Sequence, residues 1–315
     1  GRRAVLGRSL GVFTAASVAH LVVDSYGLLL AARALSGFAS GLAYAAASAA
    51  AADLAPYERR AAVMGRFNAG LFLAIPVGLP LTVWLASLGW WPATFAVQAL
   101  VGAVALWMTL RYVPPLPPTA AARRLPLLAD RGVVAVLVAT MLHVGSFFTV
   151  VQLATSWLDE EGIVPKEEQV WVWVGLGALS VVGSAAFGKL ADRLGKRRFV
   201  LMTSGVLVVC FFVLSRRWGV DYLLPVGCLL AIAAAARTGP LQALVSGLVP
   251  SEQLGALMGL RGFCMQLGVF LFAVGASGFT ERWGFRGVLL FGAACQLGSY
   301  LAVRLGVKEP RRARG

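Results

Sequence analysis

Apolar residues run through most of this chain in long stretches that short polar segments separate. The apolar stretches are about 20 to 28 residues long, which is the length that crosses the hydrocarbon core of a bilayer as a helix. Charged residues collect in the segments between them. This pattern predicts ten transmembrane helices, over residues 4–23, 27–51, 61–86, 91–111, 132–158, 168–190, 199–216, 221–247, 255–279 and 285–306.

The composition agrees with lipid as the main solvent of the side chains. Hydrophobic residues make up 59% of the chain and charged residues only 13%, roughly half the charged share of an average soluble domain. A soluble protein of 315 residues needs far more polar surface than this. The sequence therefore predicts an all-α, multi-pass integral membrane protein that contacts membrane lipid.

The net charge of +14 reflects membrane topology and does not indicate a nucleic-acid partner, because the basic residues lie in loops between apolar segments. Arg33 and Arg237 fall within predicted helices. The loops on one side hold only Lys166, Arg216, Arg217, Arg282 and Arg286, and all other Lys and Arg, with Arg261 among them, fall on the opposite side. The positive-inside rule places that richer side, which includes the first residues, in the cytoplasm.

Three landmarks occur twice along the chain. Residues 2–6 match residues 197–201, residues 56–65 match 250–259, and residues 88–91 align with 283–286, all at a spacing of about 195 residues. Six predicted helices separate equivalent landmarks, so both copies have the same orientation in the membrane. The pattern predicts two parallel pseudo-repeats, an arrangement typical of transporters that rock two half-bundles about a central site.

A proline-rich segment divides the two halves. We assign residues 1–113 to an N-terminal half-bundle, residues 114–130 to a stiff cytoplasmic linker, and residues 131–315 to a C-terminal six-helix bundle. The repeat spacing puts the start of the first half about 60 residues before Gly1. We therefore expect the chain to be truncated at its N-terminus and to lack two helices of its first half.

The sharpest local motif is the basic hairpin at residues 188–198, between two predicted helices. Its glycines allow close backbone approach, and Asp192 can accept charge-assisted hydrogen bonds from a neighbouring Arg or from a helix N-terminus. The hairpin resembles the loop motif of the major facilitator superfamily, Gly-x-x-x-Asp-Arg-x-Gly-Arg-Arg in outline, and Gly1-Arg2-Arg3 resembles the end of a first copy.

This resemblance covers essentially the whole chain. It implies the twelve-helix fold of that family with helices 3 to 12 present. Within the family, the chain most resembles the bacterial drug and sugar efflux branch. In the family this motif is associated with conformational switching. The resemblance thus implies a gating role for Gly188, Asp192, Arg193, Gly195, Arg197 and Arg198.

Two further segments resemble parts of that branch. Arg33, Gly37 and Gly41 resemble the fourth-helix pattern of proton-coupled members, which implies proton coupling through Arg33, although Arg33 can also be an interfacial side chain that reaches water. Residues 75–80 lie where drug antiporters carry a Gly-Pro-x-x-Gly-Gly motif, and only Pro76 matches in register. The alternative for this segment is a kinked helix that lines a cavity.

Polar side chains on cavity-type helices are the candidate substrate ligands. Arg237 lies deep in a helix without a nearby acid, so it needs water, a substrate or a carbonyl freed by Pro240. We predict substrate contacts for Arg237, Gln152, Tyr44, Asn68 and Gln266. Each can instead form hydrogen bonds between helices. His143 can titrate near neutral pH and assist proton coupling, or it can be a buried packing residue.

Other classes of site find little support in the sequence. Every Asp and Glu lies at or near a loop, so a proton-carrying carboxylate is expected on the two absent helices. The four cysteines fall inside apolar segments, and no catalytic triad or phosphate loop occurs. We predict no enzymatic activity, no metal and no cofactor.

The sequence thus favours a monomeric secondary active transporter of the bacterial inner membrane. It would export a small organic molecule, a drug, sugar or metabolite, in exchange for protons by alternating access. Two alternatives stay open. One is an intact ten-helix metabolite exporter built from two inverted five-helix repeats. The other is a non-transporting membrane scaffold or sensor, or an inactive fragment.

Overall fold

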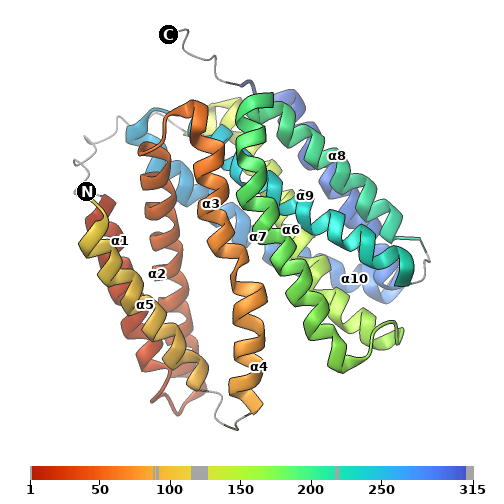
Figure 1. Cartoon of the computed structure of the whole chain (residues 1–315), viewed down its shortest axis with the longest axis horizontal. Helices are drawn as coiled ribbons and strands as arrows, with labels where there is room; N and C mark the ends of the chain where they lie inside the picture. The colour runs from red at the N-terminus through yellow and green to blue at the C-terminus, as the bar shows by residue number, and fades with distance from the viewer. Residues whose placement is uncertain (1, 88, 90–91, 115–126, 217–219, 310–315) are drawn as a thin grey trace.

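The computed structural model describes residues 2–87, 89, 92–114, 127–216 and 220–309. The first half contains α1 (Arg2–Ala19), α2 (Tyr26–Asp53), α3 (Arg60–Phe72), α4 (Leu79–Ser87) and α5 (Ala93–Tyr112). The second half contains α6 (Arg131–Glu160), α7 (Lys166–Leu194), α8 (Lys196–Leu214), α9 (Val220–Ser246) and α10 (Ser251–Gly306). Figure 1 shows these helices as two neighbouring groups. Most of the predicted linker, residues 115–126, lies outside the described residues.

Every one of the ten predicted segments overlaps a helix. Within the residues that the structure describes, eight helical stretches are long and apolar enough to cross a membrane. Their lipid-facing sides carry exposed apolar residues such as Leu28, Trp107, Val209 and Phe270. The chain is therefore a multi-pass membrane protein, as its composition predicts.

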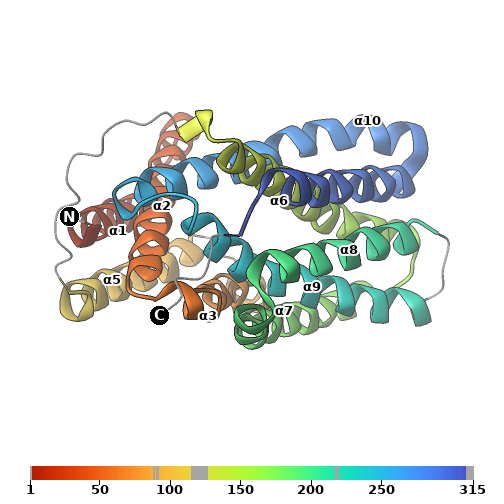
Figure 2. The same cartoon turned by 90° about the horizontal axis from the view of Figure 1, so that it is seen from above.

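Two predicted helices, 255–279 and 285–306, lie within the single element α10. Its 56 residues would extend about 84 Å if straight, well beyond the roughly 30 Å core of a bilayer. The non-helical residue Gly284, with φ 63° and ψ −165°, breaks it, and α10 doubles back there (Figure 2). No separate loop of the expected length forms, because one glycine in a left-handed conformation is enough to reverse the direction.

The predicted helix at residues 61–86 is interrupted in its middle. A π-helical segment, η2 (Ala74–Gly78), joins α3 to α4. Pro76 lies within η2 and has no N–H to donate, so the regular hydrogen-bond ladder cannot continue through it. The helix is therefore interrupted at Pro76, which agrees with the kinked-helix alternative.

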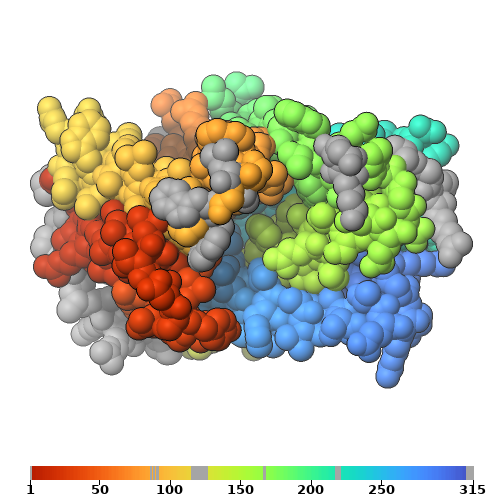
Figure 3. Space-filling model, turned by 90° about the horizontal axis from the view of Figure 1, so that it is seen from below, coloured from red at the N-terminus to blue at the C-terminus, as the bar shows by residue number. Residues whose placement is uncertain are grey.

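The two halves meet through a shared apolar core at the predicted cytoplasmic ends of the helices. Ala61 and Met64 of α3 pack there with residues from the ends of α2, α7 and α9 and the starts of α6, α8 and α10. The same cluster contains Ala52, Ala191, Leu244 and Leu257. Seen from the opposite end, a hollow separates α2 from α6 and α10 (Figure 3). The halves are thus closed against one another at one end.

Candidate functional site

The basic hairpin between α7 and α8 attaches the second half of the protein to the first. The carboxylate of Asp192 accepts hydrogen bonds from the backbone N–H groups of Ala61, at 3.1 Å, and Ala62, at 2.9 Å. These groups lie in the first turn of α3, where the helix dipole favours an anion. The prediction that Asp192 accepts hydrogen bonds from a helix N-terminus is confirmed.

A second charged residue strengthens this attachment. The ammonium of Lys196 lies 3.0 Å from Asp192 and 4.1 Å from the centre of the Tyr57 ring. Gly195, with φ 96°, turns the chain so that Lys196 comes back towards Asp192. Beyond it, Glu309 accepts hydrogen bonds from the backbone N–H groups of Lys196 (2.8 Å) and Arg197 (3.3 Å).

The other arginines of the hairpin lie further from α3. Arg197 donates to the carbonyl oxygen of Arg304 at 2.6 Å, within the second half. Arg193 and Arg198 are exposed. The hairpin therefore holds α3 through Asp192 and Lys196, and its remaining arginines face solvent or their own half.

Small residues bring the backbones of α3, α7 and α9 into contact below the hairpin. A Cβ atom added at Gly188 would lie 2.6 Å from the carbonyl oxygen of Ala61, and one added at Gly239 would lie 2.5 Å from the backbone nitrogen of Gly65. Real Cβ atoms do not approach so closely. The predicted gating residue Gly188 is thus one of several positions where only glycine fits the closed arrangement.

The chain start makes a related contact on the other side. Arg2 donates to the carbonyl oxygens of Ala49 at 3.0 Å and Ser251 at 2.6 Å, and it forms an ion pair with Asp53. Ser251 begins α10. Arg2 therefore joins α1 to the end of α2 and to the start of α10.

Arg237 lies at the centre of the molecule with no exposed surface. Its Nε donates to the Ser204 hydroxyl at 2.8 Å, and its Nη2 donates to the Ser299 hydroxyl at 2.7 Å. These hydroxyls donate onward to carbonyl oxygens of α8 and α6. The third nitrogen, Nη1, has no hydrogen-bond partner among the described residues.

Arg261 is a second buried arginine, so the prediction that it lies on the cytoplasmic side with the loop residues is wrong. It lies within α10 and is only 1% exposed, and its Nε and Nη1 have no partner in the described part of the chain. Its burial follows from helical spacing, because it continues the stripe of Leu254, Leu257 and Met258. That spacing was the signal available in the sequence.

Arg237 and Arg261 line the same small cavity, of about 30 Å³, together with His143. Phe72 of α3 and Phe147 of α6 complete part of its wall, so the cavity lies between the two halves. Neither guanidinium forms an ion pair with a carboxylate within the described ranges. The cavity therefore concentrates positive charge without a counter-ion.

His143 is fixed in this cavity by one hydrogen bond. Its Nδ1 lies 2.9 Å from Oε1 of Gln296, and an amide oxygen only accepts, so Nδ1 carries the hydrogen. The amide nitrogen of Gln296 donates in turn to the Ser146 hydroxyl at 2.9 Å. Nε2 is therefore the nitrogen at which neutral His143 can accept a proton.

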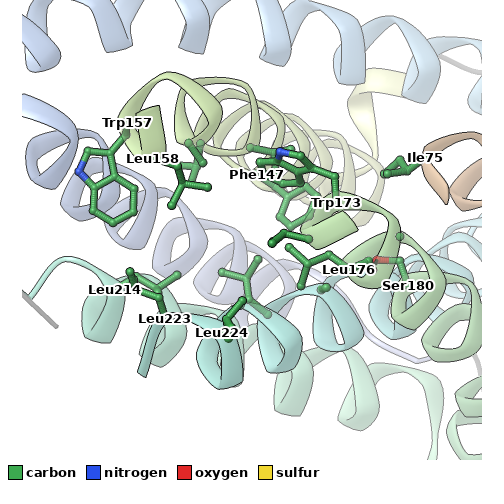
Figure 4. Close-up of a pocket in the computed structure, with 18 of the residues that line it drawn as sticks. Ile75, Phe147, Trp157, Leu158, Trp173, Leu176, Ser180, Leu214, Leu223 and Leu224 are labelled. Carbon is green, nitrogen blue, oxygen red and sulfur yellow. Dashed lines mark hydrogen bonds between the residues drawn. The ribbon is translucent and has the colours of Figure 1, made fainter. Parts of the chain in front are cut away.

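A larger apolar pocket of about 160 Å³ adjoins the cationic cavity (Figure 4). The two share Phe72, Phe147 and Phe148 as wall residues. Trp157 and Trp173 also line the pocket, and Figure 4 shows them on the same side as Phe147, facing leucines of α8 and α9. Together the two spaces form one site with a positively charged end and a larger part walled by aromatic side chains.

A hydrogen-bonded chain crosses between the halves beside this site. The hydroxyl of Tyr44 donates to Oδ1 of Asn68 at 3.2 Å, and Nδ2 of Asn68 donates to Oε1 of Gln242 at 2.7 Å. The three residues belong to α2, α3 and α9. The polar groups of Tyr44 and Asn68 are thus engaged with protein partners in this conformation.

Three other predicted residues lie away from both cavities. Gln152 and Gln266 are exposed and line neither space. Arg33 is also exposed, with its guanidinium carbon 4.7 Å from the centre of the Phe95 ring. The structure therefore brings together Arg237 and His143 from the predicted set and adds Arg261.

Comparisons with known proteins place this geometry in context. The family model described as Major Facilitator Superfamily matches residues 1–215 and 136–315. An uncharacterized MFS-type transporter of Bacillus subtilis, YbcL, is 27% identical over 283 residues, which cover 87% of this chain and 70% of that protein. A probable sugar efflux transporter of Mannheimia succiniciproducens is 26% identical over 220 residues, which cover 68% of this chain and 55% of that protein.

Solved structures share the fold at low sequence identity. The human organic anion transporter MFSD10 superposes with a TM-score of 0.82 at 18% identity, over 96% of this chain and 77% of that one. The transporter FucP in its outward conformation superposes with a TM-score of 0.77 at 12% identity, over 98% of this chain and 84% of that one. At these identities the likeness concerns the fold alone.

Proposed function

Because the chain belongs to the Major Facilitator Superfamily, we propose that it is a secondary active transporter that moves a small organic molecule by alternating access. The observation that carries this proposal is the position of the cavity around Arg237. It lies between α3 of the first half and the helices of the second, beneath an end where the halves are joined. A site at such an interface can change its accessible side when the halves rock.

The contacts that join the halves have the energy scale of a reversible gate. A hydrogen bond to a charged group contributes about 1.5–3 kcal/mol, so the few bonds made by Asp192 can be exchanged for water at a modest cost. We propose that Gly188, Asp192, Arg193, Gly195, Arg197 and Arg198 form this gate. The structure then represents the state in which the cytoplasmic side is closed.

We propose further that residues 1–113 and 131–315 act as the two moving bodies and are parallel repeats. The family model matches two overlapping parts of the chain, which supports a repeated unit. Arg2 at the start of α10 and Asp192 at the start of α3 both join the two bodies. The inverted five-helix alternative gains no such support.

For direction and coupling, we propose export in exchange for protons across a bacterial inner membrane by a monomer. One sequence relative is named a probable sugar efflux transporter, and both sequence relatives cited above come from bacteria. His143 lines the same cavity as Arg237 and Arg261, and its imidazole can exist neutral or protonated, so it is our candidate proton carrier. Arg33 keeps its proposed coupling role only as an auxiliary residue.

Distance measurements between spin labels test alternating access. With the native cysteines replaced, labels at Glu58 and Lys189 report the separation of the halves at the gate. We expect two distance populations, with the longer one favoured by Asp192→Asn. A control pair within the second half, Lys189 and Leu305, should give one unchanged distance. A single gate distance that no condition shifts contradicts transport and favours a static scaffold.

A further inference from the structure

We infer that the substrate is an organic anion with an apolar body, whose anionic group binds between Arg237 and Arg261. This inference rests on the proposed transport function and specifies the substrate class of the same site. The anionic group is a carboxylate or a group of similar size and charge. The body lies in the adjoining pocket lined by Trp157 and Trp173.

Uncompensated positive charge is the first argument. Arginine stays protonated in proteins, so Arg237 and Arg261 place two charges in a membrane interior that solvates them poorly. Neither pairs with a carboxylate in the described part of the chain, and like charges in one cavity repel. A bound anion supplies the missing counter-charge for both residues at once.

The orientation of Arg237 is the second argument. Two serine hydroxyls hold its Nε and Nη2 and fix the plane of the guanidinium. Nη1 is a buried donor without a partner among the described residues, and the same holds for Nε and Nη1 of Arg261. Buried donors are almost always satisfied in native proteins, so three free groups beside one cavity indicate a ligand that accepts hydrogen bonds.

The shapes of the two spaces are the third argument. The cationic cavity of about 30 Å³ has room for a charged group but not for a whole molecule. The adjoining pocket is larger and is walled by aromatic and aliphatic side chains. A cation would be repelled, and a neutral sugar would find few polar partners in the apolar pocket. An amphiphilic anion fits both spaces.

Calorimetric titration of the purified protein in detergent tests this inference with 2-naphthoate and its neutral counterpart 2-naphthamide. The two probes share an aromatic body and differ in charge, so we expect naphthoate to bind at least tenfold more tightly. Arg237→Met and Arg261→Met should each weaken naphthoate binding roughly tenfold to hundredfold, the scale of a lost charge-assisted hydrogen bond, without changing naphthamide binding. Arg286→Met, at an exposed site, should bind both probes as the wild type does.

Equal affinity for the two probes, or undiminished naphthoate binding by the Arg237→Met/Arg261→Met double variant, would overturn the inference. Misfolding is separated from loss of binding by thermal unfolding, because replacing an unpaired buried charge by methionine should preserve or raise stability. The titration needs no transport. If naphthoate does not bind while the spin-label distances between Glu58 and Lys189 still show two states, only the proposed substrate class is wrong.

Discussion

The hydroxyl of Ser184 donates a hydrogen bond to the carbonyl oxygen of Gly65 at 2.8 Å, across the contact between α7 and α3. This bond joins the two halves directly. It forms only because Gly65 has no side chain, since a Cβ atom there would collide with the backbone oxygen of Ser184. The closed end of the molecule therefore depends on backbone contact as well as on charge.

Replacing Gly65 by alanine should disfavour the closed arrangement. The added methyl group meets backbone atoms that cannot rotate away, and overpacking of this kind costs about 1–3 kcal/mol. We expect the Glu58–Lys189 spin-label distance to shift towards its longer population. Gly205→Ala is the matched control, because a Cβ atom there meets nothing within 4 Å. An unshifted distance in Gly65→Ala would show that α3 and α7 can adjust without separating.

Replacing Asp192 by asparagine should weaken the hairpin contact while preserving its shape. The neutral amide interacts less with the first turn of α3 and cannot pair with Lys196, so we expect a loss of about 1–2 kcal/mol from the closed state. Hydrogen exchange at the amides of Ala61 and Ala62 should accelerate. The exposed neighbour Glu58, changed to glutamine, should leave these amides protected. Equal exchange in both variants contradicts a gating role for Asp192.

Replacing Asn68 by alanine should destabilise the protein more than Tyr44→Phe does. Loss of Asn68 leaves Oε1 of Gln242 and the hydroxyl of Tyr44 without their described partners, at a cost of about 1–3 kcal/mol for each buried group. Loss of the Tyr44 hydroxyl removes one hydrogen bond, worth about 0.5–1.5 kcal/mol. Thermal unfolding in detergent measures both changes. The reverse order would indicate that these residues serve substrate binding more than joining the halves.

Replacing His143 by asparagine tests its proton-coupling role. Asparagine retains a donor near the Nδ1 position for Gln296 but cannot gain a positive charge. As the pH falls, protonated His143 would add a third cation beside Arg237 and Arg261, so the wild type should lose closed population at the gate. Because both arginines oppose a third positive charge, we expect this response only at acidic pH, and the gate distances of His143→Asn should respond less than those of the wild type between pH 6.5 and pH 4.5. An identical response would remove His143 from coupling.

The sequence was sufficient to predict a helical membrane protein, because local hydrophobicity indicates membrane spans. Eight helical stretches of the described residues meet that measure, and the predicted span at residues 4–23 is not among them. The Asp192 contact was also predictable, since an acid in a tight hairpin needs buried donors or a cation. The exposed position of Gln152 was not predicted, although helical spacing explains part of it. Gln152 lies about 200° round α6 from the buried Val150, so it faces away from the buried stripe.

Arg261 shows the opposite error. Its charge suggested a loop next to the membrane, but its spacing from Leu254 and Met258 placed it on the buried face of α10. Arg33, which the sequence allowed to be either a coupling residue or an interfacial side chain, lies exposed beside Phe95. Whether an arginine within an apolar helix faces the centre depends on tertiary packing, which the composition of one helix does not determine.

The carboxylate of Glu309 holds the start of α8 by two backbone hydrogen bonds, only a few residues from the Asp192 contact with α3. Glu309 thereby links the end of the described chain to the contact that we propose as the gate. An affinity tag or fluorescent protein fused directly after Glu309 would disturb its hydrogen bonds to Lys196 and Arg197. Such reporters should be attached through a long spacer, so that their effect on the hairpin is not mistaken for a property of the protein itself.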